Sequence, residues 1–114
     1  MKIGKKDRIK EGYSKNWQVF DYPMSSRVIG IAFQKLDGRA PEKGSFKNKV
    51  CKEIFYIING KGKLFAKGKE HSLSKEDIYV AEAGTQHYLF GENLEFITIT
   101  LPNWYPEQCE IIKN

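Results

Sequence analysis

Four ionisable side chains, spaced so that β-strands could gather them, carry most of the chemistry in this sequence. Lys47, Lys49 and Glu53 are separated by even numbers of residues. If residues 47–53 run extended, the alternation of a strand puts these side chains and that of Cys51 on one face. His87 changes its charge near neutral pH. Lysines attract anions, and a glutamate and a histidine that the fold brings together can act as base and acid.

The elements that would position these residues are short β-strands. No long window keeps the apolar spacing of an amphipathic helix without glycine or proline. β-Branched and aromatic residues occur instead in short runs between turn-forming residues. The predicted strands are 17–22, 28–36, 53–58, 63–66, 70–73, 78–81, 87–90 and 94–101. Regular spacing of this kind is typical of an all-β sandwich or barrel.

Three short segments within this pattern are predicted to be tight turns. Residues 59–62 and 91–93 combine asparagine with glycine, and 67–69 contains a glycine. Both residue types tolerate positive φ at little cost. The turns at 59–62 and 91–93 would each join two separate antiparallel strands.

The length of 114 residues suits one domain with one core, so we expect a single domain over residues 1–114. The first 15 residues are expected to be less ordered than the rest. Pro102 and Pro106 break the strand pattern. Residues 103–114 are therefore expected to form a C-terminal tail or an edge strand, the latter at 110–112.

Charge and composition favour a cytoplasmic protein that binds neither nucleic acid nor membrane. The net charge of +5 comes from lysines spread along the chain, which is typical of a solvated β surface. No run approaches the ~18 apolar residues of a membrane span, and the charged N-terminus does not resemble a secretory signal. Cys51 and Cys109 are expected to be reduced thiols, because they form no CxxC pair.

Residues 53–101 resemble the core of the cupin superfamily. Glu53 is followed after six residues by Gly60, which matches half of the first cupin motif. Gly84 and His87 match part of the second motif, and residues 62–73 look like the hairpin between the motifs. The resemblance implies a single double-stranded β-helix, a jelly-roll-like barrel, with the Glu53 face inside and opposite His87.

The sequence departs from the cupin pattern where two histidines would complete a metal site. Counting back from Glu53 puts Lys47 and Lys49 at these positions, or Phe46 and Asn48 if the spacer is longer. A protonated lysine has no lone pair for a metal. Glu53 and His87 alone would make a weak and unselective site. We therefore expect no tightly bound metal. A divalent transition metal on Glu53 and His87 with other ligands, or with help from His71, is the alternative.

The leading functional prediction is a cupin barrel that binds a small polar or anionic ligand inside. Lys47, Lys49, Glu53 and His87 would contact the ligand. Phe55 and Leu89 share strand parity with Glu53 and His87 and would line the same interior.

Three other interpretations stay open. The first is an enzyme: a sugar or keto-acid isomerase or epimerase that uses Glu53 and His87, or a metal-dependent one with non-standard ligands. The second is a structural or regulatory homodimer with an empty barrel. In the third, Lys47 and Lys49 lie in an exposed loop, and Glu53 and His87 only satisfy each other.

Some apolar residues fall on the opposite strand parity. Ile54, Tyr56 and Ile58 would face outward if Glu53, Phe55 and Ile57 face inward. An apolar outer face suggests packing against another element or subunit. Since two-fold dimers are the commonest oligomers, we expect a homodimer.

Overall fold

β-Strands make up almost the whole chain, and the computed structural model describes residues 1–113. In chain order the elements are η1 (Lys5–Asp7), β1 (Ile9–Ser14), β2 (Trp17–Tyr22), β3 (Gly30–Ala40), β4 (Ser45–Asn48), β5 (Lys52–Ala66), β6 (Lys69–Leu73), β7 (Ile78–Ala81), β8 (Gln86–Leu101), η2 (Pro106–Gln108) and β9 (Cys109–Ile112). Within residues 1–113, no helix is long and apolar enough to cross a membrane.

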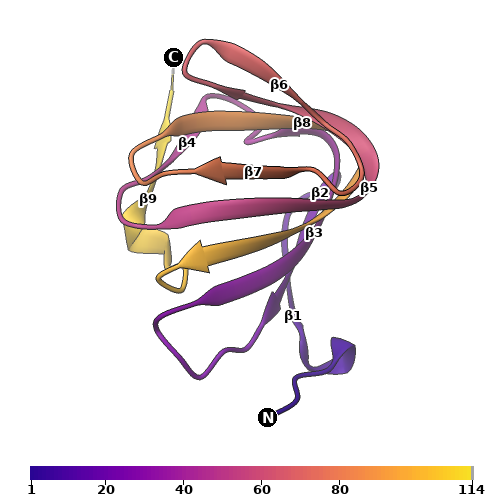
Figure 1. The fold of residues 1–114 in the computed structure, drawn as a ribbon, viewed down its shortest axis with the longest axis vertical. Coiled ribbons are helices and arrows are strands. Elements are labelled where there is room, and N and C mark those ends of the chain that lie inside the picture. Colours follow the sequence, from indigo (N-terminus) through magenta and orange to yellow (C-terminus); the bar gives the residue numbers. More distant parts are fainter. Residues whose placement is uncertain (114) are drawn as a thin grey trace.

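Two long strands, β5 and β8, form the centre of the sheet. They pair antiparallel along their whole length, from Lys52 opposite Leu101 to Ala66 opposite His87. On the outer side of β8, its later part pairs with β3 and its start pairs with β4. On the outer side of β5, its first part pairs with β7 and its last part with β6. Figure 1 shows that this sheet curls back on itself, so that its two halves face each other.

The sheet bends where three glycines lie side by side on neighbouring strands. Gly91 of β8 pairs with Gly38 of β3 on one side and with Gly62 of β5 on the other. A Cβ atom at Gly62 would lie 2.5 Å from a backbone oxygen of β8, and one at Gly91 would lie 2.6 Å from the oxygen of Leu36. The ladders also shift register next to this row. Glycine thus permits the close backbone approach that a sharp bend requires.

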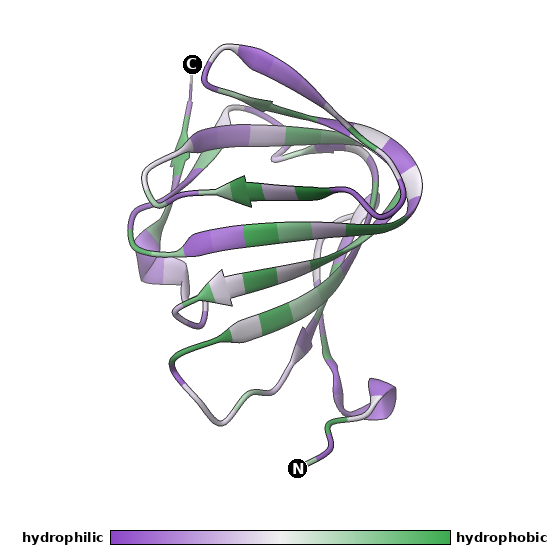
Figure 2. Cartoon of the chain, in the orientation of Figure 1, coloured by the Kyte–Doolittle hydropathy of each residue, from purple (hydrophilic) through white to green (hydrophobic). Residues whose placement is uncertain are grey.

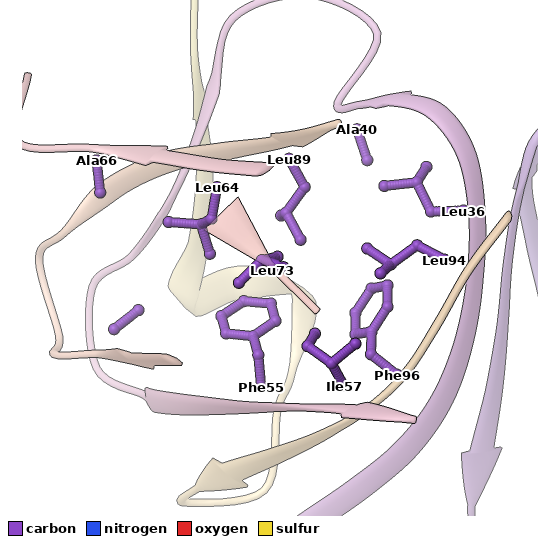
Figure 3. Close-up of a cluster of buried hydrophobic side chains, with 11 residues drawn as sticks. Leu36, Ala40, Phe55, Ile57, Leu64, Ala66, Leu73, Leu89, Leu94 and Phe96 are labelled. Atoms are coloured by element: carbon purple, nitrogen blue, oxygen red, sulfur yellow. The ribbon is translucent and has the colours of Figure 1, made fainter. Parts of the chain in front are cut away.

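The core fills the barrel next to this bend. It consists of buried side chains from both halves of the sheet, which meet in the interior: Leu36, Ala40, Phe55, Ile57, Leu64, Ala66, Leu73, Ala81, Leu89, Leu94 and Phe96. Figure 3 shows them pointing toward one another across the interior. The alternation of hydrophobic and hydrophilic residues along the strands is visible in Figure 2. The predicted inward parity of Phe55, Ile57 and Leu89 is confirmed, since all three are buried.

Two of the predicted turns are wrong. Residues 59–62 do not form a hairpin, because β5 runs on through them to Ala66 with two register shifts. Residues 91–93 likewise lie within β8. Here asparagine and glycine serve to bend a continuous strand rather than to reverse it. The turn predicted at 67–69 does join two strands, β5 and β6.

The chain ends add two elements to the sheet. Within the first 15 residues, which were expected to be less ordered, β1 pairs with β2. At the other end β9 pairs with β4, so part of the segment 103–114 lies as an edge strand. Both additions lie near the end of the barrel that the hydrophobic core does not fill.

We predict that truncating Ile57 will destabilise the protein far more than truncating Ile9. The Ile57 side chain is fully buried in the core, whereas Ile9 is 55% exposed. Ile57→Ala should lower the free energy of unfolding by about 2–5 kcal/mol through lost burial and a cavity. Ile9→Ala should cost about 1 kcal/mol or less. Chemical denaturation measures both, and equal losses would contradict this account of the core.

Candidate functional site

A cavity of about 600 Å³ occupies the end of the barrel away from the glycine bend. Its inner walls come from β3, β5 and β8, because alternate residues of these strands project inward. Apolar wall residues include Phe55, Leu89 and Phe96. The hairpin of β1 and β2 and the segment before β9 supply the remaining walls. The cavity is thus a pocket between the core and the two chain ends.

Glu53 and His87 face each other inside this cavity from different strands. The Glu53 Oε1 atom lies 3.9 Å from the His87 Nε2 atom. The two side chains are 13% and 2% exposed, respectively. Phe46 and Phe55 pack against the imidazole, with ring centroids 5.8 and 5.7 Å away. The structure therefore brings together the two residues that the sequence singled out as an acid–base pair.

A network of amides fixes the position of the Glu53 carboxyl group. Asn48 Nδ2 donates a hydrogen bond of 2.9 Å to Glu53 Oε1. The Asn48 oxygen accepts hydrogen bonds from Trp104 Nε1 at 3.2 Å and Gln108 Nε2 at 2.9 Å. The Gln108 oxygen in turn accepts from the backbone amides of Val50 and Cys51. With two donors on its oxygen, Asn48 can only present its amino group to Glu53.

Burial shifts both members of the pair toward their neutral forms. It raises the pKa of Glu53 to about 7, although the hydrogen bond from Asn48 opposes the shift. It also lowers the pKa of His87, against a smaller opposing effect of the Thr85 carbonyl. Near pH 7 the imidazole is therefore neutral, and the carboxyl group is protonated in a substantial fraction of molecules.

The neutral imidazole has one tautomer that suits its surroundings. Its Nδ1 atom lies 3.2 Å from the Thr85 carbonyl oxygen, which can only accept a hydrogen bond. The proton is therefore on Nδ1, and the Nε2 lone pair faces the Glu53 carboxyl group. His87 is arranged as a base, and protonated Glu53 as an acid.

A second group of polar side chains lines the cavity on β3 and β8. Trp17 Nε1 donates to the Gln34 oxygen at 2.9 Å, and Gln34 Nε2 donates to Thr98 Oγ1 at 3.0 Å. Thr100 lies next to Thr98 on the same face and also lines the cavity. These residues were not among the site residues predicted from the sequence. Their signal was polar residues on the inward parity of a strand, since Thr98 and Thr100 follow Phe96 at intervals of two residues.

Acidic and aromatic residues of β1 and β2 form one side of the cavity. Tyr13 stacks on Trp17 with ring centroids 4.4 Å apart and donates to Glu11 at 2.9 Å. Asp21 also lines the cavity. Burial and the neighbouring Glu11 carboxylate raise the pKa of Asp21 to about 6. This side of the cavity therefore repels anions.

Lys47 and Lys49 do not line the cavity, so their predicted inward orientation is wrong. Phe46 pairs with His87 across the ladder of β4 and β8, which puts their side chains on the same face. Phe46 and Asn48 thus point inward, and Lys47 points outward. The chain bends after Asn48, and Lys49 is exposed. Among the described residues, no lysine or arginine lines the cavity.

The other candidates are arranged for packing rather than chemistry. Cys51 and Cys109 are free thiols, as expected. The Cys51 thiol donates to the Pro102 carbonyl oxygen at 3.3 Å. Burial raises the pKa of both thiols, that of Cys109 to about 11, so neither is an activated nucleophile. His71 packs against Tyr79 outside the cavity lining.

The side chains around Glu53 and His87 fit a divalent metal poorly. Phe46 offers no donor atom, and the Asn48 oxygen already accepts two hydrogen bonds. Within residues 1–113, no three histidine, cysteine, aspartate or glutamate side chains are placed to hold one ion together. Two protein ligands fall short of the three or four that functional sites use.

We predict that Glu53→Gln will change how stability depends on pH. Folded Glu53 keeps its proton up to about pH 7, whereas an unfolded glutamate loses it near its ordinary pKa of 4.5. Folding therefore binds a proton in this window, and the contribution of Glu53 to stability is lost as the pH rises through it. Compared with wild type, Glu53→Gln should gain stability from pH 4.5 to 7, by about 3 kcal/mol at most.

Urea denaturation at several pH values measures this difference. The control is Glu110→Gln, which removes an exposed carboxyl group from the neighbouring edge strand. Its stability difference from wild type should not vary with pH in this way. A pH-independent difference for Glu53→Gln would show that the buried carboxyl group is not protonated as described.

Comparison with known proteins identifies the fold. No protein-family model matches the chain, and no curated protein sequence matches it. Among solved structures, a Streptomyces Pac13 variant with uridine superposes with a TM-score of 0.88 at 12% identity, over 99% of this chain and 90% of that chain. KdgF from Halomonas sp. superposes with a TM-score of 0.74 at 16% identity, over 90% and 94%. Ectoine synthase from P. lautus gives 0.69 at 16% identity, over 94% and 81%.

These neighbours are cupin-type barrels of similar extent. Identities this low establish the fold alone. The jelly-roll-like barrel predicted from the motifs around Glu53 and His87 is confirmed, since the chain shares the barrel fold of these neighbours.

Proposed function

We propose that this protein binds a small, uncharged, hydroxylated molecule in the barrel cavity. The observation that carries the proposal is the composition of the cavity wall. Carboxyl, imidazole, amide and hydroxyl groups of Glu53, His87, Gln34, Thr98 and Thr100 lie among aromatic side chains. A volume of about 600 Å³ falls in the usual range for ligand pockets. Such groups can donate and accept hydrogen bonds with hydroxyl groups.

The charge of the wall selects against an anionic ligand. Glu11, Asp21 and Glu53 line the cavity, and no lysine or arginine does so among the described residues. A phosphate or carboxylate would lose its hydration without gaining a cation, which is costly. Of the polar or anionic ligand predicted from the sequence, we therefore retain the polar ligand and drop the anionic one.

The aromatic wall favours a ligand with a flat or apolar portion. Trp17 and Phe46 lie with ring centroids 5.5 Å apart, and Tyr13 stacks on Trp17 with ring centroids 4.4 Å apart. Aromatic rings of this kind can pack against a base or a sugar ring. Pac13, described as a nucleoside dehydratase and solved with uridine, shares the fold. This likeness supports nucleosides and sugars as the first ligands to examine.

An acid–base enzyme is the second candidate, favoured by the arrangement of Glu53 and His87. One group is set to donate a proton and the other to accept one, and both face a cavity large enough for a substrate. This pairing of an acid and a base with shifted pKa values is typical of catalytic sites. A purely structural pair would not need a cavity beside it.

The pair could eliminate water from a substrate with a carbonyl group and a hydroxyl group on its β carbon. His87 Nε2 would take the proton from the carbon next to the carbonyl. The C–O bond to the hydroxyl would break, and Glu53 would give that oxygen its proton, which releases water and leaves a C=C bond. A proton transfer from His87 to Glu53 would restore the starting state. Without a leaving group, His87 would take the proton from the carbon next to the carbonyl while Glu53 protonates the carbonyl oxygen. Return of the His87 proton to the other carbon of the resulting enediol, and of a hydroxyl proton to Glu53, would isomerise a sugar or keto acid.

We predict that neutral nucleosides, sugars or polyols will raise the melting temperature, and that their phosphorylated counterparts will not. A ligand that binds only the folded state stabilises it by mass action. Differential scanning fluorimetry with matched pairs of neutral and phosphorylated compounds measures this. Stabilisation by the phosphorylated members alone would overturn the proposal for a neutral ligand, and no hit among either kind would favour a structural role.

We predict that Glu53→Gln and His87→Gln will lose turnover of a bound substrate by about 10²–10⁴-fold, because each removes one proton transfer. Lys47→Ala and Lys49→Ala should keep binding and turnover, since neither lysine lines the cavity. In wild type, activity should fall above about pH 7, where Glu53 loses its proton. If either lysine variant loses binding while Glu53→Gln stays active, the assignment of the site is wrong.

A further inference from the structure

The outer face of the sheet carries an apolar row that crosses five strands. On β2, β3, β8, β5 and β7, paired residues in direct register form this first row: Phe20, Phe33, Ile97, Tyr56 and Ile78. Paired residues of antiparallel strands put their side chains on the same face. Because neighbours such as Phe55 and Phe96 point into the barrel, this row points outward.

A second apolar row lies beside the first, two residues further along each strand. It consists of Tyr22, Ile31, Ile99, Ile54 and Val80. Figure 2 shows hydrophobic bands lying side by side on β7, β5, β8 and β3. We refer to the two rows together as the outer apolar face. It contains no charged side chain, which is unusual for a surface in a chain with 29% charged residues.

Within the described residues 1–113, Arg8 covers one edge of the outer apolar face. The Arg8 guanidinium lies 4.6 Å from the ring centroid of Phe20 and 5.3 Å from that of Phe33. At the β7 side, Ile78 is 62% exposed and Val80 is 44% exposed. Tyr56, on the adjacent β5, is 38% exposed. The part over β5 and β7 is therefore the most exposed part of the face.

On each side of the outer apolar face, the next row of residues along the strands contains an ion pair. Lys35 of β3 and Glu95 of β8 lie 4.0 Å apart beyond the first row. Lys52 of β5 and Glu82 lie 3.5 Å apart beyond the second row. An apolar centre with a polar, charged rim is the usual anatomy of a protein–protein interface.

We propose that the outer apolar face binds a second copy of this chain, sheet against sheet. A two-fold interface requires a surface that complements itself. Each rim holds one cation and one anion, so two identical copies can meet without a net repulsion at either rim. The net charge of the chain is +5, but neither row of the face contains a lysine or an arginine that would oppose the contact.

The charge of the rims argues against a membrane as the occupant. Glu95 and Glu82 lie beside Lys35 and Lys52 at the border of the face, so neither ion pair presents a net positive charge to an anionic lipid surface. Membrane-binding surfaces instead surround their apolar face with lysine and arginine. A protein surface with charges of both signs matches this border better.

The size of the face is sufficient for a dimer. Strands lie about 4.8 Å apart, and residues on one face follow each other every 6.8 Å or so, so the two rows with their rims span about 20 by 20 Å between side-chain centres. With the width of the side chains this is about 600 Å² of projected surface, close to the ~800 Å² that each partner buries in a stable interface. Two sheets packed in this way would form a sandwich about 10 Å thick at the contact.

The test compares the molar mass of the wild type with that of variants by sedimentation equilibrium from about 1 to 100 µM, a range that covers ordinary dimer affinities. The wild type should reach twice the chain mass of 13.2 kDa. Val80→Lys puts a charge on the exposed part of the second row of the face, and Ile78→Lys puts one on the exposed part of the first row. Each should raise the dimer Kd at least tenfold. The control is Phe90→Lys, at a residue of β8 outside the face that is similarly exposed, 45% against 44% for Val80.

Circular dichroism and a melting curve would show that each variant keeps its fold. A dimer that Val80→Lys or Ile78→Lys weakens, and that Phe90→Lys does not, supports the proposal. A wild type that stays at the monomer mass at the highest concentration overturns it. So does a dimer that both folded face variants leave unchanged, because that dimer would use another surface.

Discussion

The continuous pairing of β5 with β8 is the constraint on which the rest of the structure depends. Both strands are longer than the average strand, and a straight ladder of that length could not enclose a space. The glycines at 38, 62 and 91 let the ladder bend at one level across three strands. Each long strand then contributes its two ends to opposite walls. Glu53, near the start of β5, and His87, near the start of β8, come to face each other for this reason.

Burial is the physical effect that makes this pair chemically distinct. If both groups were exposed, they would exchange protons with water. The glutamate would then be charged near pH 7. Inside the barrel, each charged form loses hydration that the wall only partly replaces. The amide of Asn48 stabilises the carboxylate, and the Thr85 carbonyl stabilises the protonated ring, so neither shift is complete. The result is a buried pair that favours a neutral imidazole and a protonated carboxyl group.

Much of the fold and the centre of the site could be predicted from the sequence. The order of strands and turns, together with the spacing of Glu53, Gly60, Gly84 and His87, predicted the barrel. Strand parity then predicted that Phe55 and Leu89 face inward with them. These features depend on local sequence: alternation, turn residues and short motifs.

The contents of the cavity depended on contacts that local sequence does not carry. Two registers were possible before Glu53, and the bend after Asn48 decided in favour of Phe46 and Asn48 over the two lysines. That bend is held by Gln108, which reaches the amides of Val50 and Cys51 from the far end of the chain. The β1–β2 hairpin, expected to be less ordered, supplies Glu11 and Tyr13. The charge of the cavity wall is therefore opposite to the one predicted: the wall is acidic where lysines were expected.

The alternation along β5 has a consequence for how this protein can vary. Its odd-numbered residues at 53, 55 and 57 face the barrel interior, while Ile54 and Tyr56 belong to the outer apolar face. Two surfaces with different tasks are thus encoded in one strand, interleaved residue by residue. Substitutions can change either surface separately, so that the proposed ligand binding and the proposed self-association can vary independently. A deletion of one residue would exchange the two sets, placing tyrosine and isoleucine in the interior and glutamate on the outside. Length changes should therefore be confined to the loops between strands.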